Sequence, residues 1–440
     1  MNIITVDTIN YDHDKIKTKK YISPQSGLNY TIISSKIETD KDGEILENPY
    51  PEYRSIVTTE NPTELLCFAQ PSPIKYDTFI EFYNGLTDKN NEIIINELVE
   101  GTLICLYYDK RNSSWEISTR SSVECNYWFV RTEYGNTNPS QKTFREMFYD
   151  AIGTNDLNYH FEMYNTNYCY SFILQHPDNH IVLPILEPAL YLVTVYEIFP
   201  AGAEEAEEND TENGVLRQYP FVRFIPIYRF SDENADPPHP NNPLEFIYVH
   251  MQNYNTVLLP QIVPYYEMYD GIEDVSNYYP MGIMITHTLT GKQTQIVNKN
   301  YEWVRKVRGN NPNLQYHFFE VLRDGKLAEF LQYFPNYIDL FSRFHHQFQD
   351  FISQVHQAYF TYYVKKNREK NIPKRIFIHA ARIHHEIYIP EHRLIKRPVV
   401  AEYFQRMSPS QLVYYMGNNI EDDVQKPEDL GEENVVGALA

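Results

Sequence analysis

The sequence predicts an α+β fold, in which a strand-rich N-terminal part precedes an all-helical C-terminal part. Short apolar runs bounded by turn residues dominate the first part, which is typical of strands. From Gly325 onward, apolar residues such as Leu327, Phe330 and Phe334 recur at the spacing of a helix face. We expect an N-terminal extension packed on the first domain, a strand-rich domain, a helical domain and an acidic disordered tail, at residues 1–59, 60–325, 326–416 and 417–440.

The clearest strand pattern is a hairpin, formed by Leu103–Tyr108 and Trp115–Ser118 around a polar turn. One helix is expected in this domain, over Thr143–Ile152, with Ser140 as its N-cap. Acidic residues accumulate in the stretch 200–214, where we expect a mobile, exposed loop. Further strands are expected at Tyr168–Leu174, Ile181–Pro184, Leu190–Ile198, Gly282–His287 and Thr294–Val297.

A helix is expected at Asn300–Arg308, before the helical domain, and strong 3.6-residue periodicity continues within that domain from Phe341 to Val355. Prolines divide the remaining stretch up to Met416 into several helices. They are Pro335, Pro373, Pro390 and Pro398.

The net charge of −21 argues against a surface that binds nucleic acid everywhere. The charge is unevenly distributed, because the stretch Lys292–Arg406 holds 19 basic and 10 acidic residues. A basic C-terminal half can therefore contact phosphate although the whole chain is acidic.

Cysteine usage and hydropathy indicate a reduced, cytoplasmic protein that does not cross a membrane. The four cysteines show no CxxC spacing, and no apolar run reaches the length of a membrane span. We expect no metal site, because HExxH and structural zinc spacings are absent, although His379, His384 and His385 lie close together in sequence. No P-loop, GxGxxG or GxSxG motif supports a kinase, dehydrogenase or hydrolase.

Several segments together carry a family resemblance. Glu100-Gly101 precedes the apolar strand at 103–108, and the sequence Trp115-Glu-Ile-Ser-Thr-Arg120 follows it. Further segments are Tyr170–Leu174, Met281–Ile285 and Asn298–Asn310. In this order and spacing, residues 90–323 resemble the bacteriophage-type RNA ligases of the covalent nucleotidyltransferase superfamily. The resemblance implies a nucleotidyltransferase-like domain of antiparallel sheets, followed by a helical C-terminal domain.

The resemblance also implies which positions would carry the chemistry of these ligases. A lysine attacks the α-phosphate of ATP, two acidic residues hold the ribose and a divalent metal, and two basic residues neutralise the phosphates. In this chain the five positions are occupied by Leu98, by Ile173 and Met281, and by Gln295 and Val297. Leucine has no nucleophile, so we expect a pseudoenzyme without cofactor or metal. No other acid-Gly pair, at 42–43, 270–271 or 324–325, has a lysine two residues before it.

Glu100, Gly101 and Arg120 retain the residue types of the family pattern. Two interpretations remain open for them. They form a residual pocket for a nucleotide or phosphate, or Glu100 accepts backbone hydrogen bonds and pairs with Arg120 for structural reasons.

Two basic segments are candidates for RNA contact. The first consists of Arg305, Lys306 and Arg308, which follow Asn300 and Tyr301 at helical spacing. The resemblance implies that this segment faces RNA, as it does in ligase-like proteins. A denser run is interleaved with tyrosines, which suits single-stranded RNA because aromatic rings stack on bases. It consists of Lys365, Lys366, Arg368, Lys374 and Arg375. A solvated helix face is the alternative interpretation for both segments.

The sequence thus predicts a catalytically inactive RNA-ligase-like protein that acts as an RNA-binding or scaffolding subunit with RNA and unidentified protein partners. Composition and family point to viral mRNA processing or translation, in the host cytoplasm or a viral factory. One alternative is an active ATP-dependent nucleotidyltransferase or RNA ligase with relocated catalytic residues. Another is a structural virion protein that does not bind nucleic acid.

Overall fold

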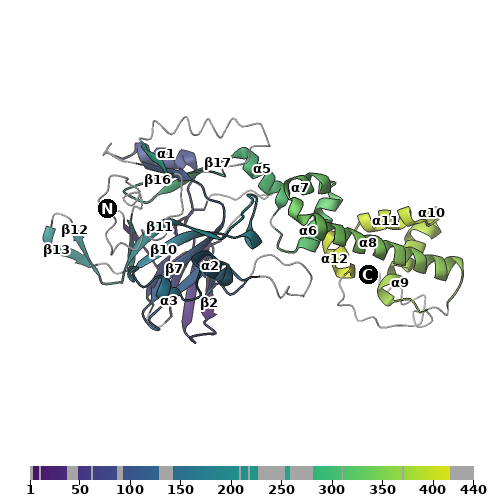
Figure 1. The fold of residues 1–440 in the computed structure, drawn as a ribbon, viewed down its shortest axis with the longest axis horizontal. Helices are drawn as coiled ribbons and strands as arrows, with labels where there is room; N and C mark the ends of the chain where they lie inside the picture. Colours follow the sequence, from purple (N-terminus) through teal and green to yellow (C-terminus); the bar gives the residue numbers. More distant parts are fainter. Residues whose placement is uncertain are drawn as a thin grey trace. The chain divides into compact units, whose positions relative to one another are not determined.

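A computed structural model shows how these segments fold (Figure 1). It describes residues 3–8, 11–36, 48–60, 63–86, 93–127, 142–207, 210–216, 219–225, 253–257, 281–309, 311–368 and 371–416. Contacts divide the chain into two units, residues 1–128 with 141–306 and residues 129–140 with 307–440. The acidic tail at 417–440 and the acid-Gly pairs at 42–43 and 270–271 lie outside the described residues.

The first unit is built around an antiparallel seven-stranded sheet, in the order β1-β14-β11-β10-β7-β8-β9. The expected hairpin forms its β7–β8 pair, in which Leu106 lies opposite Ile117. The strands are β1 (Ile3–Thr5), β7 (Thr102–Asp109), β8 (Ser114–Thr119), β9 (Ser122–Val123), β10 (Tyr168–Gln175), β11 (Ala189–Phe199) and β14 (Phe221–Ile225).

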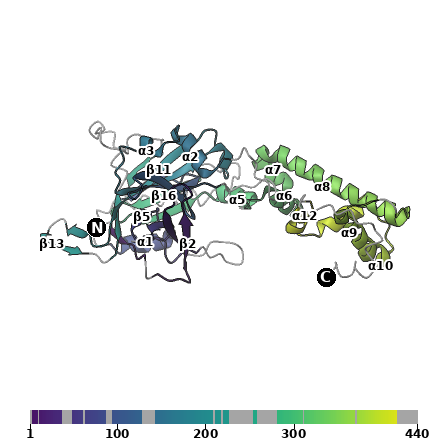
Figure 2. The same ribbon diagram turned by 90° about the horizontal axis from the view of Figure 1, so that it is seen from below.

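Two four-stranded antiparallel sheets accompany it in the first unit (Figures 1 and 2). One consists of β2 (Ile16–Ile22), β3 (Asn29–Ser35), β4 (Ile56–Thr59) and β5 (Leu65–Phe68). The other has the order β15-β6-β16-β17, with β6 (Ile93–Glu97), β15 (Asn253–Val257), β16 (Gly282–His287) and β17 (Gln293–Val297).

The seven-stranded sheet is buried on both faces. One face packs on the β2–β5 sheet through residues such as Tyr107, Tyr196 and Phe68. The other face packs on helices α2 (Phe144–Ile152) and α3 (Leu157–His160) through Ile104 and Phe148. Within the segment 1–59, expected as an extension packed on the first domain, β2, β3 and β4 form three of the four strands of this sheet.

Two local expectations about the first unit are wrong. The N-cap of α2 is Thr143 and not Ser140, because the Thr143 side chain and Glu146 form a reciprocal capping box. The acidic stretch 200–214 is not only loop, since β12 (Glu204–Glu207) pairs with β13 (Asp210–Leu216).

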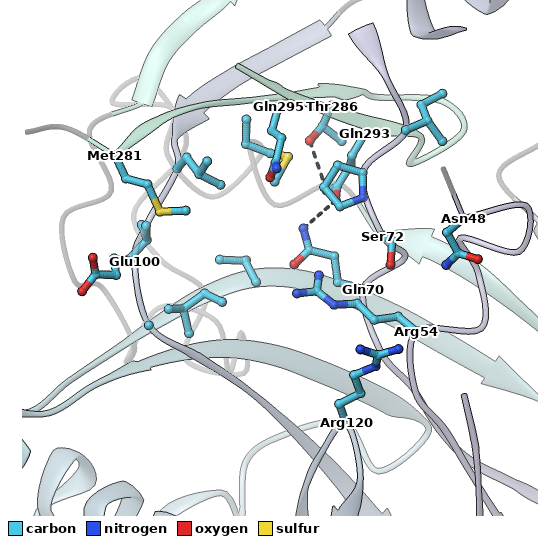
Figure 3. Close-up of a pocket in the computed structure, with 18 of the residues that line it drawn as sticks. Asn48, Arg54, Gln70, Ser72, Glu100, Arg120, Met281, Thr286, Gln293 and Gln295 are labelled. Atoms are coloured by element: carbon cyan, nitrogen blue, oxygen red, sulfur yellow. Dashed lines mark hydrogen bonds between the residues drawn. The ribbon is translucent and has the colours of Figure 1, made fainter. Parts of the chain in front are cut away.

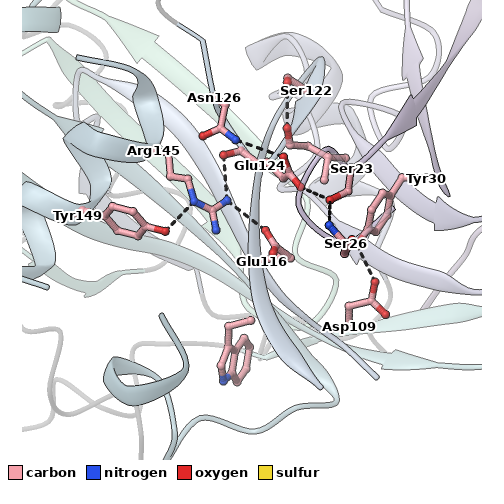
Figure 4. Close-up of polar contacts among 12 residues, drawn as sticks. Ser23, Ser26, Tyr30, Asp109, Glu116, Ser122, Glu124, Asn126, Arg145 and Tyr149 are labelled. Carbon is pink, nitrogen blue, oxygen red and sulfur yellow. Dashed lines mark hydrogen bonds and ion pairs between the residues drawn. The ribbon is translucent and has the colours of Figure 1, made fainter. Parts of the chain in front are cut away.

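A buried polar network connects the β2–β5 sheet to β8 and α2 (Figure 4). The Nη1 of Arg145 lies 3.2 Å from the Oε2 of Glu116 and donates to the backbone oxygen of Glu124 at 3.1 Å. The Glu124 carboxylate accepts hydrogen bonds from Ser23 and Tyr21. Each buried charge thus has partners from a different element, which offsets the cost of its desolvation.

The second unit is helical, as expected from the 3.6-residue periodicity. Its longest helix, α8 (Ile338–Tyr359), buries one face that includes Phe341, Phe348 and Val355. α8 packs against α9 (Lys374–Ile383) and α11 (Arg397–Gln405). The other helices are α6 (Leu314–Arg323), α7 (Leu327–Tyr333), α10 (Ile389–Glu391) and α12 (Pro409–Met416). The predicted class, antiparallel sheets followed by a helical region, is confirmed.

Candidate functional site

A cavity of about 520 Å³ lies within the first unit (Figure 3). One wall is the sheet β15-β6-β16-β17, whose opposite face packs on α1 (Tyr76–Asn84) through Ile95, Ile285 and Ile296. Because side chains alternate along a strand, the residues between these apolar positions face the cavity. They are Asn96, Met284, Thr286, Gln293 and Gln295.

The cavity brings together four of the five positions at which the resemblance implies catalytic residues. Leu98, Ile173, Met281 and Gln295 line it, whereas Val297 does not. Leu98 is 8% exposed, and its backbone N–H donates to the Gly282 oxygen at 2.9 Å. The wall formed by these residues is uncharged.

Side-chain amide groups form hydrogen bonds along the uncharged wall. The Nε2 of Gln70 donates to the Oε1 of Gln293 at 2.5 Å, and the Nε2 of Gln293 donates to Thr286 at 3.2 Å. Asn96 differs, because its buried Oδ1 has no hydrogen-bond partner among the described residues. An acceptor that is buried without a partner costs free energy, and a ligand N–H would relieve that cost.

Two arginines lie across the cavity from Gln295 (Figure 3). Arg120 donates from Nη2 to the Ser35 oxygen at 2.7 Å, while its buried Nε has no partner among the described residues. Arg54 makes no side-chain hydrogen bond or ion pair within the part of the chain that the structure describes. Burial lowers the pKa of both groups, and the Arg120 charge lowers the pKa of Arg54 further. An anion between them would remove this penalty.

Three lysines also line the cavity, Lys15, Lys36 and Lys75. The β2–β3 register places Ile16 opposite Ser35, and the Lys36 N–H donates to the Lys15 oxygen at 2.7 Å. The Nζ of Lys36 also contacts the backbone oxygen of Asp14 at 2.8 Å. Reasoning from sequence missed these lysines and Arg54, because they come from segments outside the family motifs.

Glu100 lines the cavity, but its carboxylate is already bound within the protein. Its Oε1 accepts the backbone N–H groups of Ile181, Val182 and Leu183 at 3.0–3.2 Å, and its Oε2 accepts the Tyr301 hydroxyl at 2.7 Å. The strand expected at 181–184 is therefore wrong, because these N–H groups turn toward one carboxylate instead of joining a ladder. Arg120 does not pair with Glu100.

Gly101 has a packing role. Its φ is +153°, and a Cβ there would lie 2.5 Å from the Ile173 Cγ2 and the Leu174 oxygen. Only glycine permits this approach of the β7 start to β10. The retained Glu100-Gly101 pair is thus explained by the fold, while Arg120 remains available to a ligand.

Of the basic residues that the sequence suggested for RNA contact, only Arg305 lines the cavity. Arg305, on the exposed side of α5 (Lys299–Arg308), lines the cavity, whereas Lys306 and Arg308 do not. In the second unit Lys365, Lys366, Arg368 and Lys374 are exposed and Arg375 is half-buried.

Two other kinds of site are absent from the ranges that the structure describes. No three His, Cys, Asp or Glu residues are placed to hold a metal ion. No helix there is long and apolar enough to cross a membrane.

Comparison with known proteins finds relatives among viral proteins, while no protein-family model matches the chain. The RNA ligase of Rhodothermus phage RM378 is 29% identical over 138 residues, which cover 30% of this chain and 31% of the relative. The "Immediate-early protein ICP-46 homolog" of Invertebrate iridescent virus 3 is 23% identical over 274 residues, 61% of this chain and 49% of the relative. The chain thus matches less than half of either relative's length.

Two solved structures are also similar. One is an archaeal ATP-dependent RNA ligase, with a TM-score of 0.39 and 10% identity over 71% of this chain and 64% of that chain. The other is a putative ATP-dependent DNA ligase from Aquifex aeolicus, with a TM-score of 0.39 and 9% identity over 85% of each chain.

The prediction that the chain is not an enzyme is wrong. The phage relative, which matches this chain by sequence, is named an RNA ligase, and RNA ligases are enzymes. The prediction rested on five aligned positions, and it did not consider cationic side chains that reach the cavity from residues 15–75. By sequence, the chain is a weak homologue of a phage RNA ligase, as its resemblance to the covalent nucleotidyltransferase superfamily predicts.

Proposed function

We propose that this protein binds a nucleoside triphosphate in the cavity of its first unit and acts on RNA. The observation that carries the proposal is the pair Arg54 and Arg120, two guanidinium groups in one cavity without a carboxylate partner among the described residues. Guanidinium groups bind phosphate oxygens through paired N–H donors, which suits this pair to a polyphosphate.

The shape and the opposite wall support the same ligand. A volume of about 520 Å³ falls in the range of small-molecule sites. The amides of Asn96 and Gln295 offer acceptors and donors of the kind that a nucleobase edge requires. A ligand with phosphates near the arginines and a base toward this wall matches the polarity of both sides.

A reaction is also available to this site. The neutral amine of Lys15, Lys36 or Lys75 would attack the α-phosphorus and form a phosphorus–nitrogen bond, while the bond to the bridging oxygen breaks, pyrophosphate leaves and the nitrogen loses one proton to solvent. Arg54 and Arg120 would stabilise the charge that develops on the phosphate oxygens. The observation that favours this reaction is the presence of these three lysines in the cavity lining.

RNA is proposed as the second substrate or partner. Arg305 lies at the cavity, and Lys306 and Arg308 continue along the same helix. The basic run from Lys365 to Arg375 is proposed as a further RNA contact in the second unit. The proposal includes a role in viral mRNA processing or translation, in the host cytoplasm or viral factory, together with protein partners; what supports its viral part is that both sequence relatives are viral proteins.

Binding is tested by calorimetric titration of the full chain with ATP and with GTP, each with Mg²⁺ or Mn²⁺. The double variant Arg54→Gln/Arg120→Gln is expected to lose at least about tenfold in affinity, since each charge-assisted contact contributes about 1.5–3 kcal/mol. The matched control is Arg223→Gln, which removes an exposed arginine on β14 that pairs with Glu197 on β11. Absence of binding by the wild-type chain, or equal affinity of both variants, would refute the proposal.

Catalysis is tested on the same preparations with α-labelled ATP or GTP and a denaturing gel. We expect a covalent label that disappears in one of the variants Lys15→Gln, Lys36→Gln or Lys75→Gln. An unlabelled wild-type chain that still binds ATP would refute the lysine reaction and leave the binding proposal standing.

A further inference from the structure

The second unit contains an ordered column of aromatic rings next to its basic run. The ring of His384 stacks on Tyr363 at 3.8 Å between centroids and on Tyr388 at 5.0 Å, with interplanar angles of 16° and 15°. Tyr359 lies beside this stack, with its ring 5.3 Å from Tyr363 and 5.9 Å from His384 between centroids, and its hydroxyl lies 3.3 Å from the Nδ1 of His384. The column is thus fixed by stacking and by a hydrogen bond.

Two π-helical segments build this column. One, η6 (Phe360–Val364), continues α8, and the other, η7 (His384–Tyr388), continues α9. π-helical turns are rare and occur often at functional sites, because the wider turn redirects side chains. Here both segments turn rings toward each other, which places Tyr363 from one helix against His384 from the other.

The outer end of the column, at Tyr388, is partly exposed, and the His392 ring meets Tyr388 edge-on at 6.4 Å between centroids. Tyr388 is 40% exposed, although tyrosines of the same unit such as Tyr403 are buried. Phe360 and Val364 on η6 and Ile389 next to Tyr388 are 44%, 53% and 49% exposed. An exposed flat ring beside apolar side chains offers a surface on which another flat ring can stack.

Cations lie beside two other rings of η6, which neighbour the column in sequence. The Nζ of Lys365 is 5.3 Å from the Phe360 ring centroid, and the Cζ of Arg368 is 5.5 Å from that of Tyr362. The sequence from Lys365 to Arg375 contains six basic residues and one acidic residue. Alternating rings and cations match the alternation of bases and phosphates in an unpaired nucleic-acid strand.

We propose that the column ending at Tyr388, with Lys365, Lys366 and Arg368, is a binding site for single-stranded RNA. A base stacks on the exposed part of the Tyr388 ring, next to His392, while the three cations contact the phosphates. The site rests on the proposed action on RNA, but it lies in the second unit and needs no nucleotide in the cavity. Duplex RNA is a poor ligand, because its bases are already stacked on each other.

The test measures fluorescence anisotropy of a labelled single-stranded oligouridylate of about 16 nucleotides, titrated with the full chain without ATP. Tyr388→Ala is expected to lower affinity at least about fivefold, the value of one stacked base. Tyr414→Ala is the matched control, because Tyr414 lies on α12 of the same unit and is 59% exposed. The control is expected to bind like the wild type.

Two further variants separate stacking from a structural role. Tyr388→Trp retains a flat ring and is expected to bind the oligouridylate as tightly as the wild type. Bound RNA is expected to quench the fluorescence of the new indole. This quenching tests base stacking at position 388 even if Tyr388→Ala does not fold. Lys365→Gln/Lys366→Gln is expected to flatten the slope of log K against log salt by about 0.7 per cation.

Several results would overturn the proposal: no binding of the oligouridylate by the wild type, equal affinity of Tyr388→Ala and Tyr414→Ala, equal binding of duplex and single strand, or no quenching in Tyr388→Trp. ATP titration of the same samples reports on the cavity independently, so a failure of one site is distinguishable from a failure of the other.

Discussion

The role of Glu100 can be tested because the structure gives it a different function from the one its motif suggests. The side chain is 2% exposed, and it accepts three backbone N–H groups and the Tyr301 hydroxyl. Glu100→Ala leaves these four donors buried without an acceptor. Each such group costs about 1–3 kcal/mol, and relaxation of residues 181–183 recovers part of this. We therefore expect a loss of about 3–5 kcal/mol in the free energy of unfolding.

The measurement is urea unfolding followed by tryptophan fluorescence, with ATP titration of each folded variant. Tyr301→Phe removes one of the four donors and is expected to cost about 1 kcal/mol. Glu187→Gln, an exposed carboxylate four residues beyond Leu183, is expected to change stability by less than about 0.5 kcal/mol. The reasoning is refuted if Glu100→Ala stays as stable as Glu187→Gln. It is also refuted if Glu100→Gln keeps full stability and loses ATP binding, since Glu100 would then be a ligand.

Three other predictions concern packing and buried charge. Gly101→Ala is expected to destabilise the first unit by about 1–3 kcal/mol in thermal melts, because its Cβ would overlap the Leu174 oxygen; an unchanged melting temperature would contradict this. Burial raises the pKa of Glu116, although Arg145 opposes the shift, so Arg145→Ala is expected to cost about 3 kcal/mol above neutral pH and less as pH falls and Glu116 is protonated. A loss that is independent of pH would count against this pairing. Burial lowers the pKa of His379 to about 3, so its contribution to stability is fully present above about pH 6.5 and is lost progressively as pH falls from there to about 3. His379→Gln is expected to reduce the acid sensitivity of the second unit, and an identical pH profile would disprove the role assigned to this ring.

Local patterns were sufficient for much of the fold. The hairpin β7–β8 follows from alternating apolar residues around a polar turn, and the face of α8 follows from the spacing of Phe341, Phe344 and Phe348. Both depend on contacts between residues that are close in sequence or share one period. Such patterns do not depend on where the rest of the chain lies.

The site could be predicted only in part, because its groups come together through long-range pairing. The resemblance placed Leu98, Ile173, Met281 and Gln295 at one site, and they do line one cavity. Nothing near Arg54 indicates that it would reach Arg120, and the donors to Glu100 lie 81 to 201 positions away. The segment 181–183 reads as a strand because its side chains are apolar. Its backbone N–H groups, which have no sequence signature, decide its structure.

The retained and the altered motif positions carry separate information about this protein. Glu100 and Gly101 are explained by the support they give to the cavity walls, so their presence does not argue for catalysis. The uncharged residues on β17 do not argue against it either, because Arg54 and Arg120 place positive charge on the opposite side. A triphosphate in this cavity would therefore be held by Arg54, next to the β2–β5 sheet, and by Arg120, at the end of β8, and not by residues of β17. In the proposed reaction, a lysine from residues 15–75 must reach the α-phosphorus of a triphosphate held in that orientation. Catalysis would therefore be determined by the positions of the cationic side chains in the cavity, and not by Leu98 alone.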